Sequence, residues 1–321
     1  MISPTILVAG EINADLVFRG VSPFPALGKE VLVSESQLVL GSASAICASG
    51  LARLGNRVVF AGKVGDDLFG RFCLDDMSRS GIDLEHVLVD KAASTGITVS
   101  ISSGRDRALV TCLGAIAELA AEDVPDAAFD GASHLHVAGF FLQTRLRSGL
   151  PGLFRRARRR GLTTSLDCGH DPKGEWDSGL QEALEGADLF FPNEEEIRAI
   201  SGRDNLDAAL RSFERVRVVA KLGAAGAATL EGGAILTVPA PAVEVVDTTG
   251  AGDSFDAGFL HAWLRKHPIG ECLRYGVAAG SLSTRGLGGT IAQPTAGELE
   301  SFLGLTPLHI QSPAPSEEAP S

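Results

Sequence analysis

Short apolar segments alternate along this chain with longer segments whose apolar residues recur at helical spacing, and this alternation limits the folds that it can adopt. Apolar runs typical of buried strands lie at 5–9, 57–62, 134–138, 163–166, 188–191 and 216–221. Helical patterns lie at 43–54, 67–80, 146–160, 179–184, 194–201, 252–265 and 270–285. Strands that alternate with helices form parallel sheets covered by helices on both faces. The sequence therefore predicts a three-layer α/β/α fold around a mainly parallel central sheet.

Two stretches interrupt this alternation and resemble β-hairpins instead. Residues 98–102 alternate between polar and apolar side chains, residues 103–106 suit a turn, and residues 108–111 form the returning segment. We expect the stretches 12–38 and 92–113 to form a small β-sheet, which acts as a lid on a single domain of residues 1–304. Residues 305–321 are rich in Pro, Ser, Ala and Glu, and we expect this tail to be disordered.

Charge and cysteine content restrict the partners of the chain. It carries 28 Lys and Arg against 40 Asp and Glu, a net charge of −12, which disfavours nucleic acid as a partner. No apolar run approaches the roughly 18 residues that a membrane span needs, and residues 1–10 lack the basic flank of a signal peptide. The five cysteines are scattered and form no C-x-x-C pair, which favours a reducing compartment. We therefore expect a cytoplasmic protein without nucleic acid or membrane partners.

The segment 247–255 reads D-T-T-G-A-G-D-S-F and lies between an apolar run at 243–246, which we expect to be a strand, and a predicted helix. Gly250, Ala251 and Gly252 allow a close approach of the backbone to a ligand, and the first N–H groups of the helix are unpaired. Together they form an anion hole suited to phosphate. A carboxylate beside such a hole, Asp253, is best explained as a general base for an attacking hydroxyl. An N-cap role explains Asp253 alone, but not all nine residues.

These residues make the sequence similar to the ribokinase-like (PfkB) family of carbohydrate kinases, whose C-terminal signature D-T-T-G-A-G-D-x-F is matched at every fixed position. The family's N-terminal signature is matched less closely at 41–55, because Ser42 replaces a glycine and Ile46 replaces an asparagine. The resemblance extends over about 5–303. It implies a ribokinase-like fold, Asp253 as the general base and Gly250 to Gly252 as the anion hole for the transferring phosphoryl group. The P-loop and dinucleotide-binding motifs are both missing from the sequence.

The resemblance also implies that ATP and Mg²⁺ bind to the C-terminal half of the chain. Asn193 and Glu196 match the family's N-x-x-E, in which the glutamate acts on Mg²⁺ indirectly, although Asn193 alone also suits a helix N-cap. Further residues assigned to the nucleotide are Lys221, Gly223, Gly226 and Thr248. Asp247 and Thr249 match positions that hold K⁺ in many members.

The segment G-E-I-N-A-D at 10–15 follows the first predicted strand and resembles the sugar-binding segment of the family. Asn13 and Asp15 are two residues apart, so they face the same way in an extended chain. A turn after the strand explains the same residues, but ligands of α/β sheets bind at this end of the strands. We expect Gly41 and Ser42 to close against the sugar and Gln143 to add a polar contact.

The sequence therefore predicts an ATP-dependent kinase that phosphorylates a sugar hydroxyl. The expected acceptor is a pentose, a ketohexose or a keto-sugar acid. A phosphosugar is a further alternative, because Arg105 and Arg107 in the expected lid can meet the phosphate of a substrate. The alternatives are a nucleoside kinase of the same family and a non-catalytic regulator that binds sugar or nucleotide on the same fold. Because lid-to-lid dimers are frequent in similar proteins, we expect a homodimer that forms through the lid.

Overall fold

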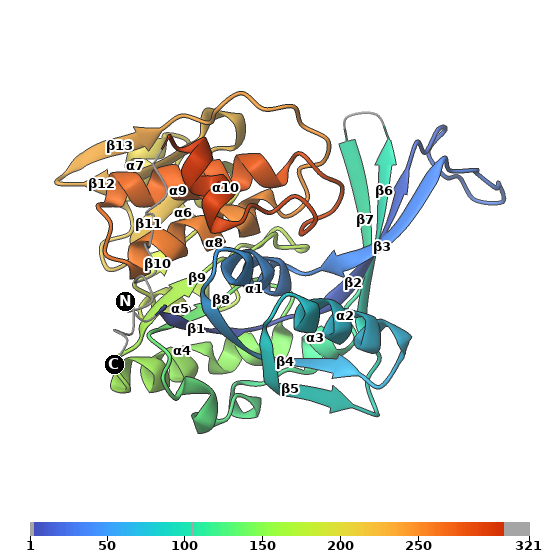
Figure 1. Ribbon diagram of the computed structural model, residues 1–321, viewed down its shortest axis with the longest axis horizontal. Coiled ribbons are helices and arrows are strands. Elements are labelled where there is room, and N and C mark those ends of the chain that lie inside the picture. The colour runs from blue at the N-terminus through green and yellow to red at the C-terminus, as the bar shows by residue number, and fades with distance from the viewer. Residues whose placement is uncertain (1–2, 104–105, 305–321) are drawn as a thin grey trace, which may run out of the picture.

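The computed structural model describes residues 3–103 and 106–304 (Figure 1). Within these residues, a nine-stranded sheet has the order β13-β12-β11-β10-β9-β8-β1-β4-β5. Its strands are β1 (Thr5–Ala9), β4 (Arg57–Gly65), β5 (Asp83–Asp90), β8 (His134–Val137), β9 (Thr163–Leu166), β10 (Leu189–Phe190), β11 (Arg217–Lys221), β12 (Ala227–Glu231) and β13 (Ala234–Val238). Neighbouring strands from β5 to β11 are parallel, whereas β12 and β13 add an antiparallel edge. The predicted, mainly parallel α/β fold is confirmed.

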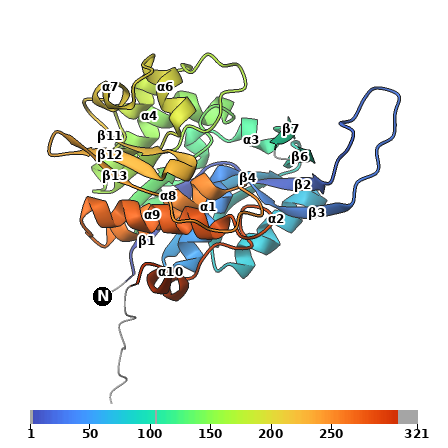
Figure 2. The same ribbon diagram turned by 90° about the horizontal axis from the view of Figure 1, so that it is seen from above.

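Helices cover both faces of this sheet, as Figure 2 shows. One face carries α1 (Ala43–Arg53), α2 (Leu68–Arg79), α8 (Ala251–Leu264), α9 (Ile269–Ser283) and α10 (Ala296–Phe302). The other carries α3 (Ala115–Glu118), α4 (Thr144–Arg159), α5 (Leu180–Leu184), α6 (Glu194–Ser201) and α7 (Leu206–Arg211). A hydrophobic core lies on each face of the sheet, and β1 contributes to both because its side chains alternate between the faces. Ile6 and Val8 belong to the first core, and Leu7 and Ala9 belong to the second.

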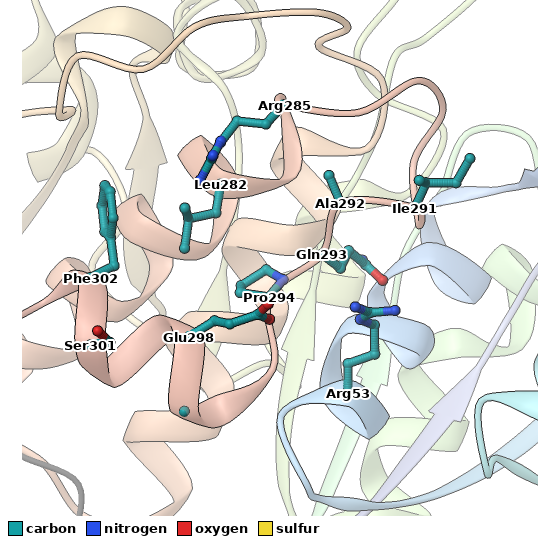
Figure 3. Close-up of a pocket in the computed structure, with 11 residues that line it drawn as sticks. Arg53, Leu282, Arg285, Ile291, Ala292, Gln293, Pro294, Glu298, Ser301 and Phe302 are labelled. Atoms are coloured by element: carbon teal, nitrogen blue, oxygen red, sulfur yellow. The ribbon is translucent and has the colours of Figure 1, made fainter.

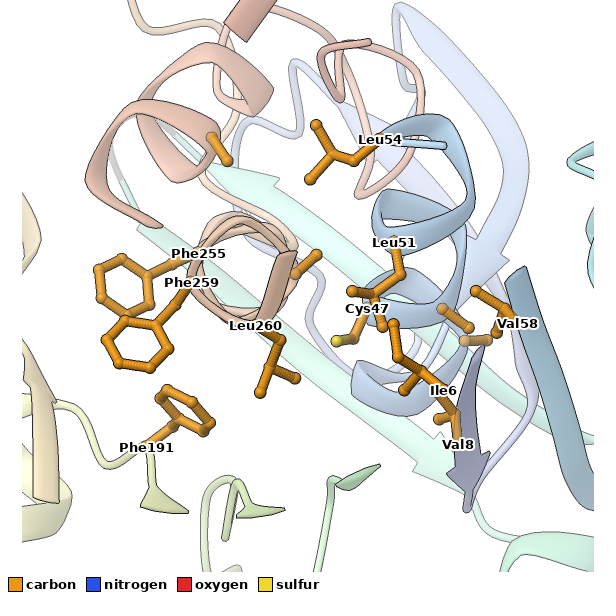
Figure 4. Close-up of a cluster of buried hydrophobic side chains, with 14 of the residues drawn as sticks. Ile6, Val8, Cys47, Leu51, Leu54, Val58, Phe191, Phe255, Phe259 and Leu260 are labelled. Carbon is orange, nitrogen blue, oxygen red and sulfur yellow. The ribbon is translucent and has the colours of Figure 1, made fainter. Parts of the chain in front are cut away.

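The first core fixes helix α8, whose N-terminus carries the signature segment. Phe255 and Phe259 of α8 stack on each other, and Phe259 makes an edge contact with Phe191, which follows β10. Figure 4 shows these rings on one side of α8 and the residues of α1 and β1 on the other. Burying a side chain of this size contributes about 1.5–3 kcal/mol. Packing against both α1 and the sheet therefore gives the start of α8 a rigid support.

The prediction of a strand at 243–246 is wrong. These residues have no regular secondary structure, and Val245 and Val246 are 56% and 43% exposed. The backbone N–H groups of Val246 and Asp247 instead donate to the carbonyl oxygen of Thr284, at the C-terminal end of α9. Apolar residues here line a cavity rather than a sheet. The sequence analysis also missed β5, the β12–β13 hairpin, α3, α7 and α10.

The lid is a second sheet, in the order β3-β2-β6-β7. Its strands are β2 (Asn13–Arg19), β3 (Glu35–Gly41), β6 (Gly96–Ser103) and β7 (Asp106–Cys112). This confirms a small β-sheet built from two separate stretches, but the first stretch reaches Gly41, and residues 20–34 between β2 and β3 contain no strand. Figure 2 shows this connection as a long loop that extends away from the rest of the chain. The predicted tail, 305–321, lies outside the described residues. None of the helices described is long and apolar enough to span a membrane.

Candidate active site

The residues predicted to act on ligands gather at the edge of the large sheet where the parallel strands end. The strand order changes direction at β1, because β4 pairs with one side of β1 and β8 with the other. A change of direction of this kind opens a crevice at the carboxyl ends of the strands, which is where open α/β sheets bind ligands. The lid begins at Asn13, shortly after β1 ends at Ala9, so the lid starts at the same place (Figure 1).

The predicted anion hole opens helix α8. Gly250 caps this helix with a φ of 72°, and Asp253 lies in its first turn. A Cβ at position 250 would lie 2.6 Å from Cα of Gly289, so only glycine fits there. The loop is fixed from the other side by Asp247, whose carboxylate accepts hydrogen bonds from the N–H groups of Thr249 and Gly288, each at 2.9 Å. The backbone of the hole is therefore held in place before a ligand binds.

A cavity of about 540 Å³ lies directly beside the anion hole. The predicted nucleotide residues Lys221, Gly223, Gly226 and Thr248 all line it, together with Ala251 and Gly252 of the hole. Its remaining walls are largely apolar and come from Phe255, from α9, from residues 240–243 and from Val245. An apolar slot that ends at a phosphate-binding helix terminus suits a nucleotide, whose base is flat and whose phosphates are charged.

A buried group of three charged side chains lies under this cavity. The ammonium nitrogen Nζ of Lys221 lies 2.6 Å from Asp167 and 3.4 Å from Asp256, and the three side chains are 12%, 5% and 1% exposed. Burial opposes ionisation, yet Lys221 holds the pKa of Asp167 below its usual value, whereas burial raises the pKa of Asp256 well above it. A Cβ at Gly252 would lie 3.3 Å from Nζ, so the positive charge lies next to the anion hole.

Asn193 and Glu196 bond to each other in a capping box at the start of α6. The side-chain oxygen of Asn193 accepts from the N–H of Glu196 at 2.9 Å, and the carboxylate of Glu196 accepts from the N–H of Asn193 at 2.8 Å. This N-cap role uses only the side-chain oxygen of Asn193, so it is compatible with the predicted contact between the amide nitrogen and a phosphate. Burial first, and then the charge of Asp167, raises the pKa of Glu196 to about 7.

Glu196, Asp167 and Cys168 form a cluster whose potential ligand atoms lie within 4.8 Å of one another. Mg²⁺ prefers carboxylate oxygens and water, so the two carboxylates suit it. Burial raises the pKa of the Cys168 thiol, which stays neutral and adds no ligand that Mg²⁺ would favour. Asp167 uses both of its carboxylate oxygens, one for Lys221 and one for the N–H of Gly169, whereas the hydrogen bonds to Glu196 fall on one oxygen. Glu196 therefore suits the predicted indirect role at Mg²⁺ better than Asp167 does.

On the sugar side, Asn13 and Asp15 face the same way, as predicted. The amide nitrogen of Asn13 donates to Asp15 at 3.1 Å and to Thr98 of the lid at 2.8 Å. Asn13 is 4% exposed, and its side-chain oxygen has no hydrogen-bond partner among the described atoms. Gly41 lies opposite Asn13 in the β2–β3 pair, and a Cβ at Gly41 would collide with the side chains of Asn13 and Asp15. A glycine is therefore needed here to leave room for both polar groups.

The structure explains the two positions where the sequence departs from the family pattern. Ser42 has a φ of 74°, a left-handed conformation that glycine adopts more readily. Its hydroxyl holds the position by donating to the carbonyl oxygen of Glu11 and accepting from the N–H of Ala45. Ile46 is buried, and its side chain lies against Gly250 and Gly289, where an added Cβ would come within 3.0 Å of it. It therefore packs beneath the anion hole.

Gln143, which we expected to add a polar contact to the sugar, is almost completely buried. It is 1% exposed, and its amide nitrogen donates to the carbonyl oxygen of Ala138 at 2.5 Å. Its side-chain oxygen has no partner among the described atoms. Arg105 lies outside the described residues, as does the side chain of Arg107.

Glu11 is a site residue that the sequence analysis did not assign. It is 4% exposed, and its carboxylate accepts from the N–H of Ala43 at 3.0 Å. Burial above all, with smaller contributions from the charges of Asp253 and Asp15, raises the pKa of Glu11 to about 8. Glu11 therefore lies within electrostatic reach of both the predicted base and the predicted sugar-binding carboxylate. The signal in the sequence was an acidic residue two positions after the end of a buried strand.

Comparisons with known proteins find relatives along most of this chain. The model of the pfkB family carbohydrate kinases matches residues 3–296. The chain is 30% identical over 299 residues to an ATP-dependent ribose-1-phosphate kinase of Halopiger xanaduensis, which covers 93% of this chain and 97% of the relative. It is also 30% identical over 296 residues to a 5-dehydro-2-deoxygluconokinase of Geobacillus thermodenitrificans, with 86% of each chain covered.

Solved structures share the fold. A putative ribokinase II from E. coli in complex with ATP and Mg²⁺ superimposes with a TM-score of 0.83 at 22% identity, covering 94% of this chain and 99% of the other. A fructokinase double mutant from Vibrio cholerae with bound fructose, ADP and potassium gives a TM-score of 0.78 at 26% identity, covering 94% and 98%.

Proposed function

This chain belongs to the pfkB family of carbohydrate kinases, and we propose that it transfers the γ-phosphoryl group of ATP to the primary hydroxyl of a pentose, a ketohexose or a keto-sugar acid. It is a sugar kinase by family, so the proposal concerns the acceptor class and the roles of the residues. The observation that carries the proposal is the position of Asp253. This carboxylate lies in the same helical turn as the anion hole, beside the cavity lined by the predicted nucleotide residues.

The acceptor sugar lies between the lid and the end of β1 in this proposal. Asp15 and the unpartnered oxygen of Asn13 accept hydrogen bonds from sugar hydroxyls, and Gly41 and Ser42 border the sugar. Gln143 offers a buried acceptor oxygen on the same side. This arrangement holds one hydroxyl of the sugar next to Asp253. A sugar fixed in this way meets the base and the phosphoryl group in one geometry, which lowers the barrier by removing the entropy of encounter.

The chemical step is an attack of the sugar hydroxyl on the γ-phosphorus of ATP. Asp253 takes the hydroxyl proton as the O–P bond forms, and ADP leaves. The N–H groups of Gly250 and Gly252 donate to the equatorial oxygens of the transferring group, where negative charge is concentrated. The N–H of Ala251, which donates to the carbonyl oxygen of Thr248 at 3.3 Å, is shared with them. The ammonium group of Lys221 adds a fixed positive charge next to Gly252.

The two metal ions are part of the proposal. Mg²⁺, held through Glu196, would neutralise charge on the phosphates of ATP. We place K⁺ near Asp247 and Thr249. The hydroxyl of Thr249 donates to the carboxylate of Asp247, which also accepts from the N–H of Gly288. The E. coli structure contains ATP and Mg²⁺, and the Vibrio cholerae fructokinase contains potassium, which supports the choice of the two ions.

The experiment that tests the proposal is an assay of ADP release over a panel of sugars, sugar acids, phosphosugars and nucleosides, each with and without K⁺. We expect turnover with at least one pentose, ketohexose or keto-sugar acid, and a faster rate with K⁺. Phosphosugars belong in the panel because one relative is named for ribose 1-phosphate. Turnover with nucleosides alone would show that the acceptor is a nucleoside and not a sugar or sugar acid. Binding of sugar or ATP without ADP release from any acceptor would make the protein a non-catalytic regulator.

We also propose that two copies of the chain associate through their lids. Leu109 and Val110 are neighbours on the edge strand β7 and therefore point to opposite faces, yet both are more than half exposed, at 57% and 62%. An uncovered edge strand with apolar side chains invites pairing with another chain. Sedimentation equilibrium should give a dimer mass for the wild type and a monomer mass for Leu109→Lys with Val110→Lys. A wild-type monomer at all concentrations would refute this association.

A further inference from the structure

A second cavity lies on the side of α9 that faces α1 and α10, away from the nucleotide cavity. It measures about 660 Å³ and is bordered by the C-terminal ends of α1 and α9, the segment 291–294 and helix α10. Figure 3 shows Arg53 and Arg285 on different sides of it, with Gln293, Pro294 and Glu298 between them. This cavity shares no lining residue with the nucleotide cavity, so the proposed kinase reaction does not explain it.

The charges around this second cavity favour an anion. Neither Arg53 nor Arg285 has a side-chain hydrogen bond or ion pair to any of the residues that the structure describes. Glu298 is the acidic residue in the lining, and its carboxylate accepts hydrogen bonds from the N–H and the hydroxyl of Thr295. Those bonds first, and then the charges of Arg53 and Arg285, lower the pKa of Glu298. Two positive charges against one negative charge leave a net charge of +1.

Gln293 is a buried polar group whose hydrogen bonding is incomplete. It is 1% exposed, and its amide nitrogen donates to the carbonyl oxygen of Ile46 at 2.9 Å and to the hydroxyl of Ser254 at 3.0 Å. The carbonyl of Ile46 can only accept, which fixes the orientation of the amide. The side-chain oxygen of Gln293 then has no partner among the described atoms. Figure 3 shows this oxygen directed toward the side of the cavity where Arg53 lies.

Leaving a buried acceptor unsatisfied is costly and rare in folded proteins, so it indicates a missing donor. Guanidinium groups recognise carboxylates and phosphates through paired hydrogen bonds. The remaining walls of the cavity include the apolar side chains of Leu282, Pro294 and Phe302, which suit the C–H groups of a small ligand. The lining therefore suits a ligand with an anionic group, a hydrogen-bond donor and a short carbon skeleton.

We propose that this cavity binds a small hydroxylated anion, a hydroxy acid or a phosphorylated polyol. Arg53 and Arg285 hold the carboxylate or phosphate group, and a ligand hydroxyl donates to the side-chain oxygen of Gln293. The site is separate from the sugar site, and its occupation does not depend on the kinase reaction. Through Gln293 it lies one hydrogen bond from Ser254, the residue that follows Asp253.

Isothermal titration calorimetry tests this proposal on the full chain, with three-carbon probes. Glycerate carries a carboxylate and hydroxyls, glycerol 3-phosphate carries a phosphate and hydroxyls, propionate lacks the hydroxyls, and glycerol lacks the charge. We expect saturable binding of glycerate or glycerol 3-phosphate, and whichever binds identifies the anionic group. Propionate should bind about threefold to tenfold more weakly than glycerate if glycerate is the ligand, because the oxygen of Gln293 stays unpaired. Glycerol should not bind.

The double variant Arg53→Gln with Arg285→Gln locates the binding. It should weaken the affinity by about tenfold or more, since both charge-assisted contacts are lost. Arg79→Gln, which removes an exposed arginine on α2 outside the cavity, is the matched control and should bind like the wild type. Thermal melting of each variant confirms that it is folded. No binding of either anion, or equal affinity in the wild type and the double variant, would overturn the proposal, whatever the outcome of the ADP-release assay.

Discussion

Replacing Gly250 by alanine tests whether the backbone geometry of the anion hole controls the reaction. The change adds one methyl group at a residue with a φ of 72°, and this Cβ would lie 2.6 Å from Cα of Gly289 and 3.0 Å from its carbonyl oxygen. Non-bonded carbon atoms prefer a separation of about 3.5–4.0 Å, so one of the two backbones must move by roughly 1 Å. The contact is with main chain, which cannot rotate away as a side chain could.

Two effects contribute to the expected result, and a matched variant separates them. The left-handed conformation alone costs a non-glycine residue about 1–2 kcal/mol. Gly202, which caps α6 at its C-terminal end, has a φ of 65° and open space where a Cβ would lie. Gly202→Ala should therefore lose only this conformational free energy of folding and keep its turnover. Gly250→Ala should lose more stability, and its kcat should fall by about 10²-fold because the phosphate donors are displaced.

The assay is steady-state ADP release at saturating ATP and acceptor, with urea unfolding of both variants measured in parallel. A kcat of Gly250→Ala within a factor of two or three of that of Gly202→Ala would refute the argument. It would mean that the N–H groups near Gly250 do not stabilise the transferring phosphoryl group, or that the loop adapts without displacing them.

Three further changes address the buried charges and the sugar contacts. Lys221→Met removes the partner of buried Asp167 and should lower the free energy of unfolding by about 3–5 kcal/mol in urea melts. Arg79→Met, at the exposed pair with Asp76, is the control and should lower it by under about 1 kcal/mol. Similar losses in the two variants would contradict the buried arrangement. Folding raises the pKa of Glu11 from 4.5 to about 8, so between these pH values the folded chain keeps a proton that the unfolded chain releases. The free energy of unfolding of the wild type therefore falls as the pH rises through this range. Glu11→Gln should remove that loss, and parallel stability curves of wild type and variant over this range would count against it. Asp15→Asn should raise KM for the acceptor by roughly tenfold and leave KM for ATP unchanged, and an unchanged acceptor KM would exclude Asp15 from the sugar site.

Periodicity was enough to predict the layers of the fold, because strands buried on both faces are continuous apolar runs. The strands Thr5–Ala9 and Thr163–Leu166 and the helix Glu194–Ser201 have the predicted bounds. The run 243–246 looked the same in the sequence but is not a strand, since its apolar side chains line the nucleotide cavity. Strand β5 was missed because it lies at the edge of the sheet, where half-exposed positions weaken the apolar pattern.

The sequence motifs located the site, but not the interactions that connect its parts. The capping box of Asn193 and Glu196 and the shared direction of Asn13 and Asp15 follow from local spacing, so they could be predicted. The contact of Lys221 with Asp256 joins residues 35 positions apart and depends on how β11 packs against α8. The buried acceptor of Gln293 likewise depends on tertiary packing. The role of Ser42 needed the observed φ of 74°, because serine does not by itself indicate a left-handed residue.

The most direct test of the central claim is the kcat of Asp253→Asn at saturating ATP and acceptor, with ATP binding measured by calorimetry on the same preparation. Asparagine keeps the size of the side chain but cannot take the hydroxyl proton. If Asp253 is the general base, kcat falls by about 10²–10⁴-fold while ATP affinity stays close to that of the wild type. If the variant keeps near-full turnover under these conditions, Asp253 is not the base, and the proposed mechanism is wrong.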